Sequence, residues 1–444
     1  MNIVKLYFVF LQHPIITIDS RDCPAGSIFF ALKGEKFDGN DFIKQALRNG
    51  AAFAVGDRAD LPKDKRIIRV DNVLKSLQDL AYIHRKQQKN IDVIAITGTN
   101  GKTTTKELVA AALSTRYPVL FTEGNLNNHI GVPLTLLRLK PEHRFAIIEM
   151  GANHPGEIRD LCRIAEPNYG LITNVGKAHL EGFGSFEGVV RAKTELYDYI
   201  REKGGTIFVN TDNPILKDRS ENTERIFYGT SREAFVQGRI IDSEDYLELE
   251  WRNSCYPVFD EEFQFRVKTQ LVGNYNFENV LAAVCIAEFF NNIEALRATA
   301  RQNNAIADYA PANNRSQSLK TERNTLIIDA YNANPSSMQV ALDNFLSLKI
   351  SPKMVIIGEM KELGEYAPEE HRKLVERLKE SAIDKVILCG ENFSNIGSIT
   401  PNRMVVFRHT QELLNYLQSE KFSGFHILIK GSRANQLERA IEFL

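Results

Sequence analysis

The residues with the clearest chemistry form a glycine-rich stretch, which reads Thr97-Gly98-Thr99-Asn100-Gly101-Lys102-Thr103-Thr104. An apolar run that predicts a strand precedes it and a run that predicts a helix follows, as a phosphate-binding loop requires. Backbone N–H groups of such a loop cradle phosphate oxygens, while Lys102 would reach the β- and γ-phosphates and the Thr103 hydroxyl a Mg²⁺ ion. The full motif has a glycine where Ile96 stands, so a plain strand–helix turn is the alternative. The flanking elements favour a nucleotide site.

Two further candidates lie at the carboxyl ends of predicted strands, where parallel sheets bind ligands, and a third lies in a predicted helix. Glu149 ends the run RFAIIEM and could hold Mg²⁺, although a loop or N-cap carboxylate is an equal alternative. His179 comes just after YGLITNV, where it could be a ligand or a solvated side chain. Lys193 lies in the helical run VVRAKTELYDYI, and by itself it reads as a surface lysine.

Polar residues at other element ends carry weaker signals. Asn276 and Asn279 open a predicted helix, where capping is the default explanation for asparagine. Asp329 and the Asn332-Ala333-Asn334-Pro335 turn follow another strand, an arrangement that is also common in purely structural roles. The turn Lys430-Gly431-Ser432-Arg433 could meet an anionic group, but short basic turns are usually solvated.

The elements that position these residues fall into three α/β units, as about 150 residues per domain suggests for 444 residues. We expect domains at 1–89, 90–311 and 312–444. In the first, strands are predicted at 27–32 and 51–55 and helices at 41–49 and 73–89. From residue 92, β-branched runs alternate with helical segments, which is typical of parallel strands with crossover helices.

The later part of the chain departs from this alternation once. Residues 223–272 show alternating polar and apolar runs that predict antiparallel hairpins, and 273–290 predicts a long buried helix. The turn-rich RQNNAIADYAPANNR predicts the end of the central domain near residue 310. The strands from NTLIIDA to FHILIKG predict a third, Rossmann-like unit. The fold class expected is therefore α/β, with a small N-terminal domain, a central parallel-sheet domain with the phosphate loop, and a Rossmann-like C-terminal domain.

Composition excludes several classes of protein. The chain has 55 Lys+Arg and 56 Asp+Glu, so it lacks the basic field that nucleic acids or anionic membranes attract as main partners. Its five cysteines are scattered without C-x-x-C spacing, which argues against a disulfide framework or a zinc site. No run reaches the roughly 18 apolar residues of a membrane span, and the apolar run 6–11 is short for a signal peptide. We expect a cytoplasmic protein.

In order and spacing, the motifs resemble those of the Mur ligases, which build the peptidoglycan precursor in the bacterial cytoplasm. The matching stretches are DSR followed by IFFALKGEKFDGNDFI, ITGTNGKTTTKE, GNLNNHIGVPLTLL, EMGANHPGEI, ITNVGKAHLEGFGS, AKTELY, GNYNFENVLAA, IIDAYNANPSSM, IGEMKELGE and IKGSR. Within the family, FFALKGEKFDG, AYNANPSSM and GEMKELGE favour the ligases that add D-alanyl-D-alanine to UDP-N-acetylmuramoyl-tripeptide. The resemblance implies ATP-driven amide formation through an acyl phosphate, with these two substrates as partners. We expect a monomer.

The resemblance also implies roles for the candidates. The loop Gly98–Thr104 would bind ATP, and Lys102, His179 and Lys193 would be catalytic. Thr103 and Glu149 would hold one Mg²⁺, and His179 with Lys193 a second. Lys193 fits there only if it is carbamylated, because an ammonium beside a divalent cation is repelled by about 4 kcal/mol per unit-charge pair at roughly 4 Å and an effective dielectric constant of about 20.

Other family positions would bind nucleotide and substrate. The nucleotide set is Asn276, Asn279, Arg315 and Asp329, of which the last two would arrive from the third domain when the domains close. The substrate set is Ser20, Arg21, Ala31 and Lys33 for the uridine diphosphate end, Asn127 and Asn128 for the peptide, and Asn332 and Asn334 for the dipeptide. The family often has His-Asn where this chain has Tyr275-Asn276, which predicts altered packing against adenine.

Two alternatives stay open on the sequence. One is another Mur-type or folyl-polyglutamate-type amide ligase, which would share the phosphate loop and the fold. The other is a nucleotide-binding regulatory or scaffold protein that kept the fold without turnover, since fold alone does not secure function.

Overall fold

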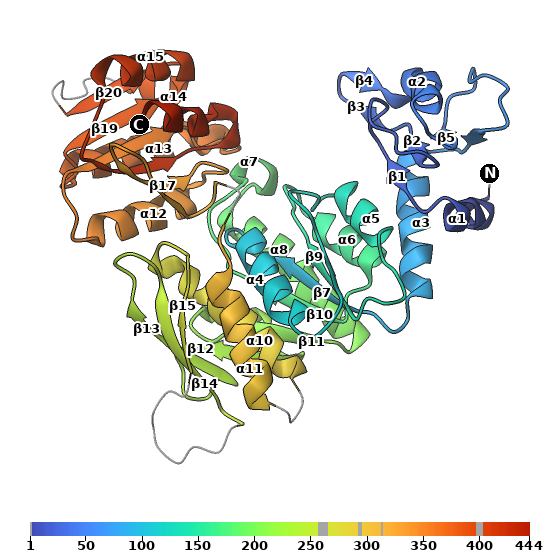
Figure 1. Cartoon of the computed structure of the whole chain (residues 1–444), viewed down its shortest axis with the longest axis horizontal. Helices are drawn as coiled ribbons and strands as arrows, with labels where there is room; N and C mark the ends of the chain where they lie inside the picture. The colour runs from blue at the N-terminus through green and yellow to red at the C-terminus, as the bar shows by residue number, and fades with distance from the viewer. Residues whose placement is uncertain (1, 256–264, 292–294, 312–313, 397–402) are drawn as a thin grey trace.

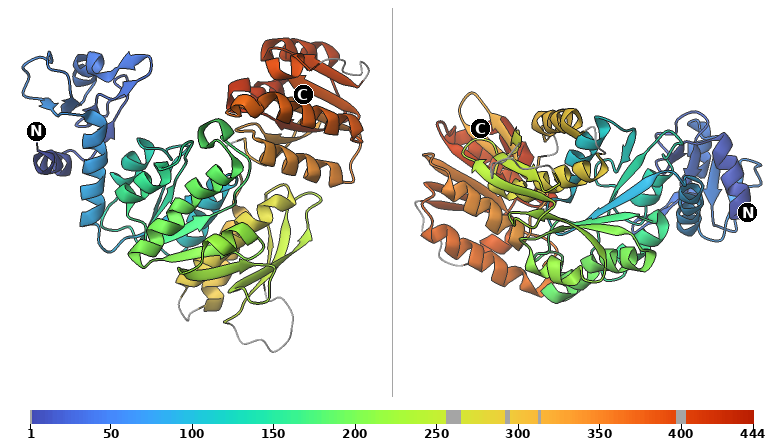
Figure 2. Two further views of the ribbon diagram at one scale, coloured as in Figure 1. Left: turned by 180° about the vertical axis from the view of Figure 1, so that it is seen from behind. Right: turned by 90° about the horizontal axis from the view of Figure 1, so that it is seen from below.

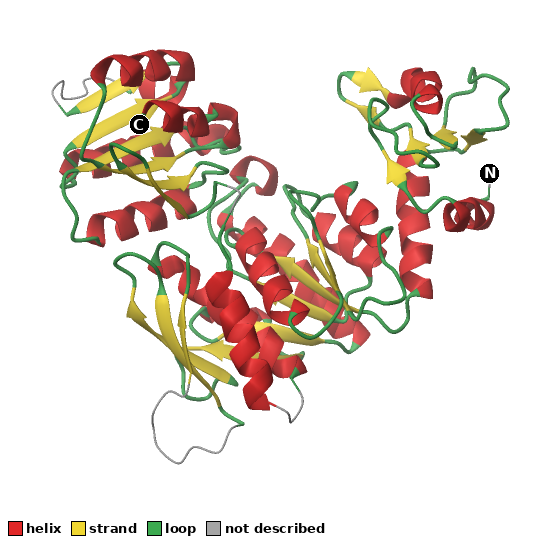
Figure 3. Cartoon of the chain, in the orientation of Figure 1, coloured by secondary structure: helices red, strands yellow, loops and turns green. Residues whose placement is uncertain are grey.

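The computed structural model describes residues 2–255, 265–291, 295–311, 314–396 and 403–444. They form three lobes, each built around its own sheet, with the central lobe between the other two (Figure 1). Strands and helices are mixed in every lobe (Figure 3). The expected α/β class with three domains is confirmed. Among the described residues, no helix combines the length and the apolar character needed to cross a membrane.

The first lobe is a small parallel sheet packed on one long helix. Its strands, in spatial order, are β1 (Ile16–Thr17), β2 (Ile28–Phe30), β5 (Phe53–Gly56) and β6 (Ile67–Arg69). A hairpin of β3 (Lys33–Gly34) and β4 (Phe37–Asp38) leads through a short 3-10 turn into α2 (Ile43–Arg48). The apolar run 6–11 lies in the helix α1 (Ile3–Gln12), whose Leu6 and Phe10 are buried.

The helix α3 (Val73–Gln87) joins the first lobe to the second. It packs against α1 on one side and against α5 (Gly131–Leu136) and α6 (Glu157–Ala165) of the central lobe on the other. Its apolar positions Val73, Leu77 and Leu80 are buried, in the three-to-four-residue rhythm of a helix face. A single rigid element therefore carries the first lobe.

The central lobe contains a nine-stranded sheet. Its strands, in spatial order, are β15 (Phe265–Lys268), β14 (Glu248–Asn253), β13 (Val236–Asp242), β12 (Glu224–Gly229), β11 (Thr206–Asn210), β10 (Tyr169–Ile172), β7 (Asp92–Thr97), β9 (Phe145–Glu149) and β8 (Val119–Phe121). The strands from β8 to β13 are parallel, and β14 and β15 form antiparallel pairs.

The prediction of antiparallel hairpins over 223–272 is wrong at its start and right at its end. The strand β12 is parallel to β11 because the crossover helix α9 (Pro214–Arg219) lies between them. The alternating polar and apolar runs that the prediction used overlap β14 and β15. These strands form the antiparallel pairs β13–β14 and β14–β15.

Helices cover both faces of the central sheet. Ile94 and Ile96 of β7 share an apolar core with α4 (Lys102–Ser114) and α10 (Phe277–Phe290), whereas Val93 and Ala95 share one with α5, α6 and α8 (Phe186–Lys203). Seen from behind, α8 lies across the face opposite α4 and α10 (Figure 2). Burial on both faces explains why the strands read as continuous apolar runs.

The segment from Arg301 to Asp308 is helical, contrary to the turn expected there. It forms the end of α11 (Ala295–Asp308), where Ile306 is buried. One of its polar residues, Gln302, is buried inside the protein, where its Nε2 donates to Glu288 Oε1 at 3.3 Å. The polar composition of this segment wrongly predicts a turn, because the carboxylate that Gln302 binds lies on another helix, α10.

The third lobe has the Rossmann-like arrangement expected. Its strands, in spatial order, are β16 (Gln317–Lys320), β17 (Thr325–Asp329), β21 (His426–Lys430), β18 (Lys353–Gly358), β19 (Lys385–Cys389) and β20 (Met404–Phe407), all parallel except β16. Its helices are α12 (Pro335–Ser347), α13 (Ala367–Glu380), α14 (Glu391–Ser394) and α15 (Thr410–Glu420).

Candidate functional site

The glycine-rich loop joins the end of β7 to the start of α4. Gly98 and Gly101 have φ angles of 142° and 79°, in the left-handed region that favours glycine. A Cβ at Gly98 would collide with Thr173 Oγ1, and one at Gly101 with Asn279 Oδ1. Ile96, which replaces the first glycine of the full motif, is fully buried inside β7. The loop therefore needs the two glycines it has and forms without a third.

Lys102 folds back over this loop. Its Nζ donates to the carbonyl oxygens of Gly98 at 2.8 Å and Thr99 at 3.0 Å. Burial lowers the pKa of Lys102 to about 8, although Glu149 opposes the shift. This half-buried ammonium has only neutral carbonyl partners among the described residues, so it would gain from an anionic group, because hydrogen bonds to charged acceptors are stronger.

Glu149 ends β9 and is buried among polar partners, so it is neither a helix cap nor a solvated loop carboxylate. Thr103 Oγ1 donates to its Oε2 at 2.9 Å, and Asn127 Nδ2 donates to its Oε1 at 2.8 Å. Lys106 Nζ, which is buried and has no hydrogen-bond partner among the described residues, lies 3.8 Å from Oε2. Hydroxyl and carboxylate oxygens are the hard donors that Mg²⁺ prefers. Thr103 and Glu149 thus fit the predicted cation.

Apart from Thr103 and Glu149, the ligands of such a cation would be waters and phosphate oxygens. Within the described ranges, no group of three or more His, Cys, Asp and Glu side chains is arranged to hold a metal ion. Mg²⁺ commonly keeps several waters and binds through one or two carboxylates together with substrate phosphates. Thr103 and Glu149, which lie beside the phosphate loop, are compatible with this type of coordination.

Lys193 is not a surface residue, which corrects the reading taken from its helix alone. It is 2% exposed, and its Nζ donates to the carbonyl oxygen of Ala152 at 3.3 Å. The ammonium also lies 5.5 Å from the centre of the Phe183 ring. Burial, together with the charge of Lys102, lowers the pKa of Lys193 to about 7.

His179 begins the short helix α7 (Leu180–Phe183) with a positive φ of 50°. Its Nδ1 contacts the Oε2 atom of Glu362, a residue of the third lobe that sequence reasoning did not single out. The contact with His179 lowers the pKa of Glu362. The signal for Glu362 was available in the stretch GEMKELGE, but only the fold brings it to His179.

Asn276 and Asn279 do not cap α10, contrary to the default explanation. Asn276 Nδ2 donates to the Val272 carbonyl at 2.9 Å, and Asn279 Nδ2 donates to Asn276 Oδ1 at 3.0 Å. Thr105 Oγ1 of α4 donates to Asn279 Oδ1 at 3.1 Å. The two amides therefore fix the start of α10 against the phosphate loop. Tyr275 hydrogen-bonds Ser316 at 2.8 Å, so it joins the central lobe to the segment before β16.

Arg315 and Asp329 enter from the third lobe. The Arg315 guanidinium lies 3.8 Å from the centre of the Tyr331 ring, and its buried Nε has no hydrogen-bond partner in the described structure. Asp329 forms an ion pair with Lys430. Lys430 is 1% exposed, so the expectation of a solvated basic turn is wrong for it. Tyr331 was not predicted, because nothing in the sequence shows which residue stacks on Arg315.

A cavity of about 1320 Å³ lies between the central and third lobes. The predicted residues that line it are Thr99, Asn100, Gly101, Lys102, Thr104, Asn127, Asn128, Glu149, His179, Asn276, Asn279, Arg315, Asp329, Asn332 and Asn334. Gly98, Thr103 and Lys193 lie just behind this lining, through the contacts above. Asn334 Nδ2 donates to Asn100 Oδ1 at 2.9 Å, which joins the dipeptide and phosphate segments directly.

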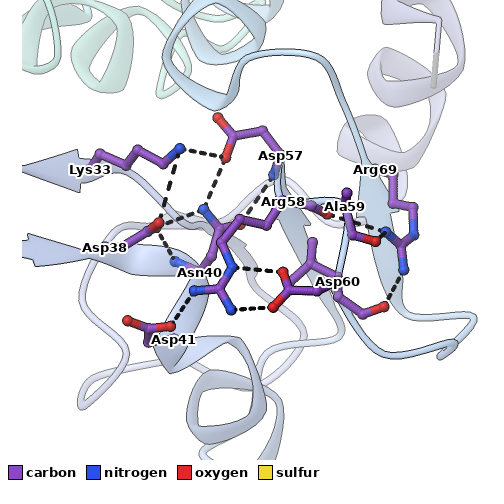
Figure 4. A network of polar contacts seen from close by, with 10 residues as sticks. Lys33, Asp38, Asn40, Asp41, Asp57, Arg58, Ala59, Asp60 and Arg69 are labelled. Carbon is purple, nitrogen blue, oxygen red and sulfur yellow. Dashed lines mark hydrogen bonds and ion pairs between the residues drawn. The ribbon is translucent and has the colours of Figure 1, made fainter.

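The predicted residues of the first lobe lie away from this cavity. Ala31 is fully buried, Ser20 contacts Gln45, and Arg21 pairs with Asp19 on the surface. Lys33 forms ion pairs with Asp57 at 3.4 Å and Asp38 at 4.0 Å, next to Asn40 and Arg58 in a polar network (Figure 4). The structure thus brings together the nucleotide, cation and peptide candidates, but not the uridine diphosphate candidates.

Comparisons with known proteins show which family the chain resembles. Family models match along the chain: "Mur ligase family, catalytic domain" at 14–97, "Mur ligase middle domain" at 96–287 and "Mur ligase, glutamate ligase domain" at 314–433. The UDP-N-acetylmuramoyl-tripeptide--D-alanyl-D-alanine ligase of Bacillus subtilis (strain 168) is 32% identical over 438 residues, which cover 97% of this chain and 92% of the relative.

Solved structures show the same likeness. A crystal structure of MurF from Acinetobacter baumannii has a TM-score of 0.83 and 30% identity, covering 96% of this chain and 92% of that chain. MurF ligase from Thermotoga maritima in complex with ADP has a TM-score of 0.81 and 28% identity, covering 98% and 97%. The resemblance inferred from the motifs is confirmed, and the chain belongs to the Mur ligase family.

Proposed function

We propose that this chain is the ATP-dependent ligase that joins D-alanyl-D-alanine to UDP-N-acetylmuramoyl-tripeptide. The γ-phosphoryl group would move to the terminal carboxylate of the tripeptide, and ADP would leave. The dipeptide amine would then attack the acyl phosphate, forming the amide and releasing phosphate. The observation that carries this proposal is that the phosphate loop, the Thr103–Glu149 pair and third-lobe residues meet at the same cavity. The names of the relatives supply the two substrates.

ATP would bind with its phosphates on the loop Gly98–Thr104. There Lys102 would exchange its carbonyl partners for phosphate oxygens, and the unpaired Nε of Arg315 would gain a charged acceptor. Asn279, held by Thr105 and Asn276, would meet the adenine side, with Tyr275 close by. Asp329, which is paired with Lys430, would contact the nucleotide from the third lobe.

Mg²⁺ would bind at Thr103 and Glu149, and a second Mg²⁺ at His179 and a carbamylated Lys193. The cations would supply charge neutralisation for the transferring phosphoryl group. Lys193 supports the modification because its amine is buried beside another lysine, where an ammonium is disfavoured and an anion would be paired. Lys106 would balance the charge of Glu149 from behind.

The substrates would reach the cavity from two sides. Asn127 and Asn128 would line the path of the tripeptide, and Asn332 and Asn334 that of the dipeptide. The uridine diphosphate end would extend to Ser20, Arg21, Ala31 and Lys33 of the first lobe. The cavity lining includes Lys75 and Gln78 of α3, the helix that leads toward that lobe, which supports such an extended pose.

The remaining expectations complete the proposal. The domain limits are 1–89, 90–311 and 312–444, supported by the confinement of each main sheet to one of these ranges. We expect a cytoplasmic monomer that uses neither nucleic acid nor a membrane as a partner. The near-neutral charge of −1 supports the expectation that neither nucleic acid nor a membrane is a partner.

The test is release of inorganic phosphate with Mg²⁺, ATP, UDP-N-acetylmuramoyl-tripeptide and D-alanyl-D-alanine, omitting one component at a time. Release should need every component and be lost in Lys102→Ala, while Lys86→Ala, which changes an exposed lysine of α3, should keep it. Release with a single amino acid in place of the dipeptide would instead identify a sister ligase. Nucleotide binding without release under any combination would refute the enzyme and support the regulatory alternative.

A further inference from the structure

Two side chains from different lobes meet at the wall of the cavity. His179 precedes α7 in the central lobe, and Glu362 follows β18 in the third lobe. Both line the cavity, and Glu362 Oε2 contacts His179 Nδ1. The imidazole side chain is about a quarter exposed (23%) and forms part of the cavity lining.

Both residues have a strained backbone. The φ angles are 50° for His179 and 62° for Glu362, and only eight non-glycine residues in the described part of the chain have positive φ. Such conformations cost free energy and persist where the surrounding structure holds them, often at functional sites. That two of the eight touch each other across a lobe boundary indicates a contact that is specifically maintained.

Neighbouring contacts hold the two segments together. The Glu181 N–H donates to the Glu362 carbonyl at 3.4 Å, and the Tyr366 hydroxyl donates to the Gly184 carbonyl at 3.2 Å. Gly364 is so close that a Cβ there would lie 3.2 Å from Glu181 Cβ. These backbone contacts hold the Glu362 segment against the His179 segment, and this places the carboxylate next to the imidazole.

The chemistry of this contact defines the state of the imidazole. Nδ1 and Oε2 form an ion pair in which only Nδ1 can donate a hydrogen, because a carboxylate oxygen only accepts. In the neutral ring Nε2 then has a free lone pair, and no described residue hydrogen-bonds it. Histidines that bind metals commonly donate their other N–H to a carboxylate, which fixes both tautomer and ring orientation.

We propose that Glu362 is a positioning residue that holds His179 with Nε2 ready for a divalent cation. Because Glu362 belongs to the third lobe, the cation site is complete only when that lobe is seated against α7. Cation binding and the seating of the third lobe would therefore strengthen each other. The inference rests on the metal role of His179 in the proposed function and adds Glu362 to it.

A purely mechanical tie between lobes would behave differently. The pair Lys177–Glu370, at 3.6 Å, and the Tyr366–Gly184 hydrogen bond cross the same boundary without touching His179. Removing either contact would loosen the interface but leave the imidazole oriented. Tyr366→Phe is therefore a matched control for Glu362→Ala.

The experiment titrates Mn²⁺ into the full chain with a non-hydrolysable ATP analogue and follows bound Mn²⁺ by electron paramagnetic resonance. Glu362→Ala should weaken the His179-dependent Mn²⁺ site about tenfold or more. Glu362→Gln, which keeps an acceptor oxygen, should lie between this variant and the wild type, and Tyr366→Phe should bind like the wild type. In the double variant His179→Ala/Glu362→Ala, the second change should add nothing, as expected for residues that act through each other.

Three results would overturn the inference. Wild-type Mn²⁺ binding in Glu362→Ala, with weak binding in His179→Ala, would remove the positioning role and leave the metal role of His179 intact. An equal loss in Tyr366→Phe and Glu362→Ala would show that seating of the lobe alone sets the affinity. Normal binding in His179→Ala would refute the metal role itself, and with it the inference. Thermal unfolding of each variant identifies any that fail to fold, and Glu362→Gln then carries the comparison.

Discussion

Replacement of Lys193 by arginine separates a carbamylated lysine from a simple buried cation. Arginine keeps a positive charge, but its guanidinium stays protonated and cannot form a carbamate. If the site works with a cation, Lys193→Arg retains activity. If it works with a carbamate, activity is lost, because the charge opposite the metal site changes from negative to positive.

The structure gives the size of the effect that makes carbamylation possible. CO₂ adds to the neutral amine, with release of a proton, and the ordinary pKa of 10.5 falls to about 7 at Lys193. Near pH 7 about half of this amine is then neutral, compared with about one in three thousand for an ordinary lysine. Burial thus raises the reactive population roughly a thousandfold. The carbamate population should fall as the pH is lowered, because acid restores the ammonium form of Lys193 and removes the carbamate.

The assay combines two measurements on the purified chain. With ¹³C-labelled bicarbonate, the wild type should show a carbamate carbon signal by NMR that Lys193→Arg lacks. Phosphate release in CO₂-depleted buffer should fall and return on addition of bicarbonate, and the dependence should grow as the pH drops from about 7 to about 6. Lys203→Arg, a change at an exposed lysine ten residues along the same helix, should preserve both signals. Full activity in CO₂-depleted buffer, with no carbon signal in the wild type, would refute the reasoning.

Three other changes test the site. Lys102→Met should weaken binding of an ATP analogue by about tenfold to a hundredfold in titration calorimetry, which is the value of a charge-assisted hydrogen bond. The pKa of Lys102 in the folded state is lowered to about 8, so the unfolded state holds this proton to higher pH than the folded state. The free energy of unfolding of the wild type should therefore rise between about pH 7 and 9 in denaturant titrations, and that of the variant should rise less. Asn334→Ala removes the capping box of α12 and the contact with Asn100, and should lower the free energy of unfolding by about 1 kcal/mol. Arg315→Lys keeps the charge but loses the planar stacking on Tyr331, so analogue affinity should fall while the urea midpoint stays near that of the wild type.

The parts of the fold that follow from local pattern were predictable. The apolar runs of β7 and β9 are buried on both faces, and the glycines of the loop occupy backbone conformations that only glycine adopts easily. Most candidates identified from the family motifs line one cavity, because parallel strands present their carboxyl ends at the same edge of a sheet.

Several of the wrong predictions concern residues whose partners lie far along the chain. Lys193 reads as a surface residue on its own helix, and Lys430 as a solvated turn, because Ala152 and Asp329 cannot be assigned to them from spacing. The polar end of α11 was misread for the same reason, since Glu288 accepts its hydrogen bonds. Glu362 was missed because its partner His179 lies in another lobe.

The packing behind the phosphate loop also bears on how resistance to inhibitors can arise. Any side chain at Gly98 or Gly101 would collide with Thr173 or Asn279, in a backbone conformation that other residues resist. A compound held by the loop's N–H groups would thus contact atoms that single codon changes cannot remove without distorting the loop. Escape mutations should therefore appear in the third-lobe wall, around Arg315 and Tyr331, and leave these two glycines unchanged.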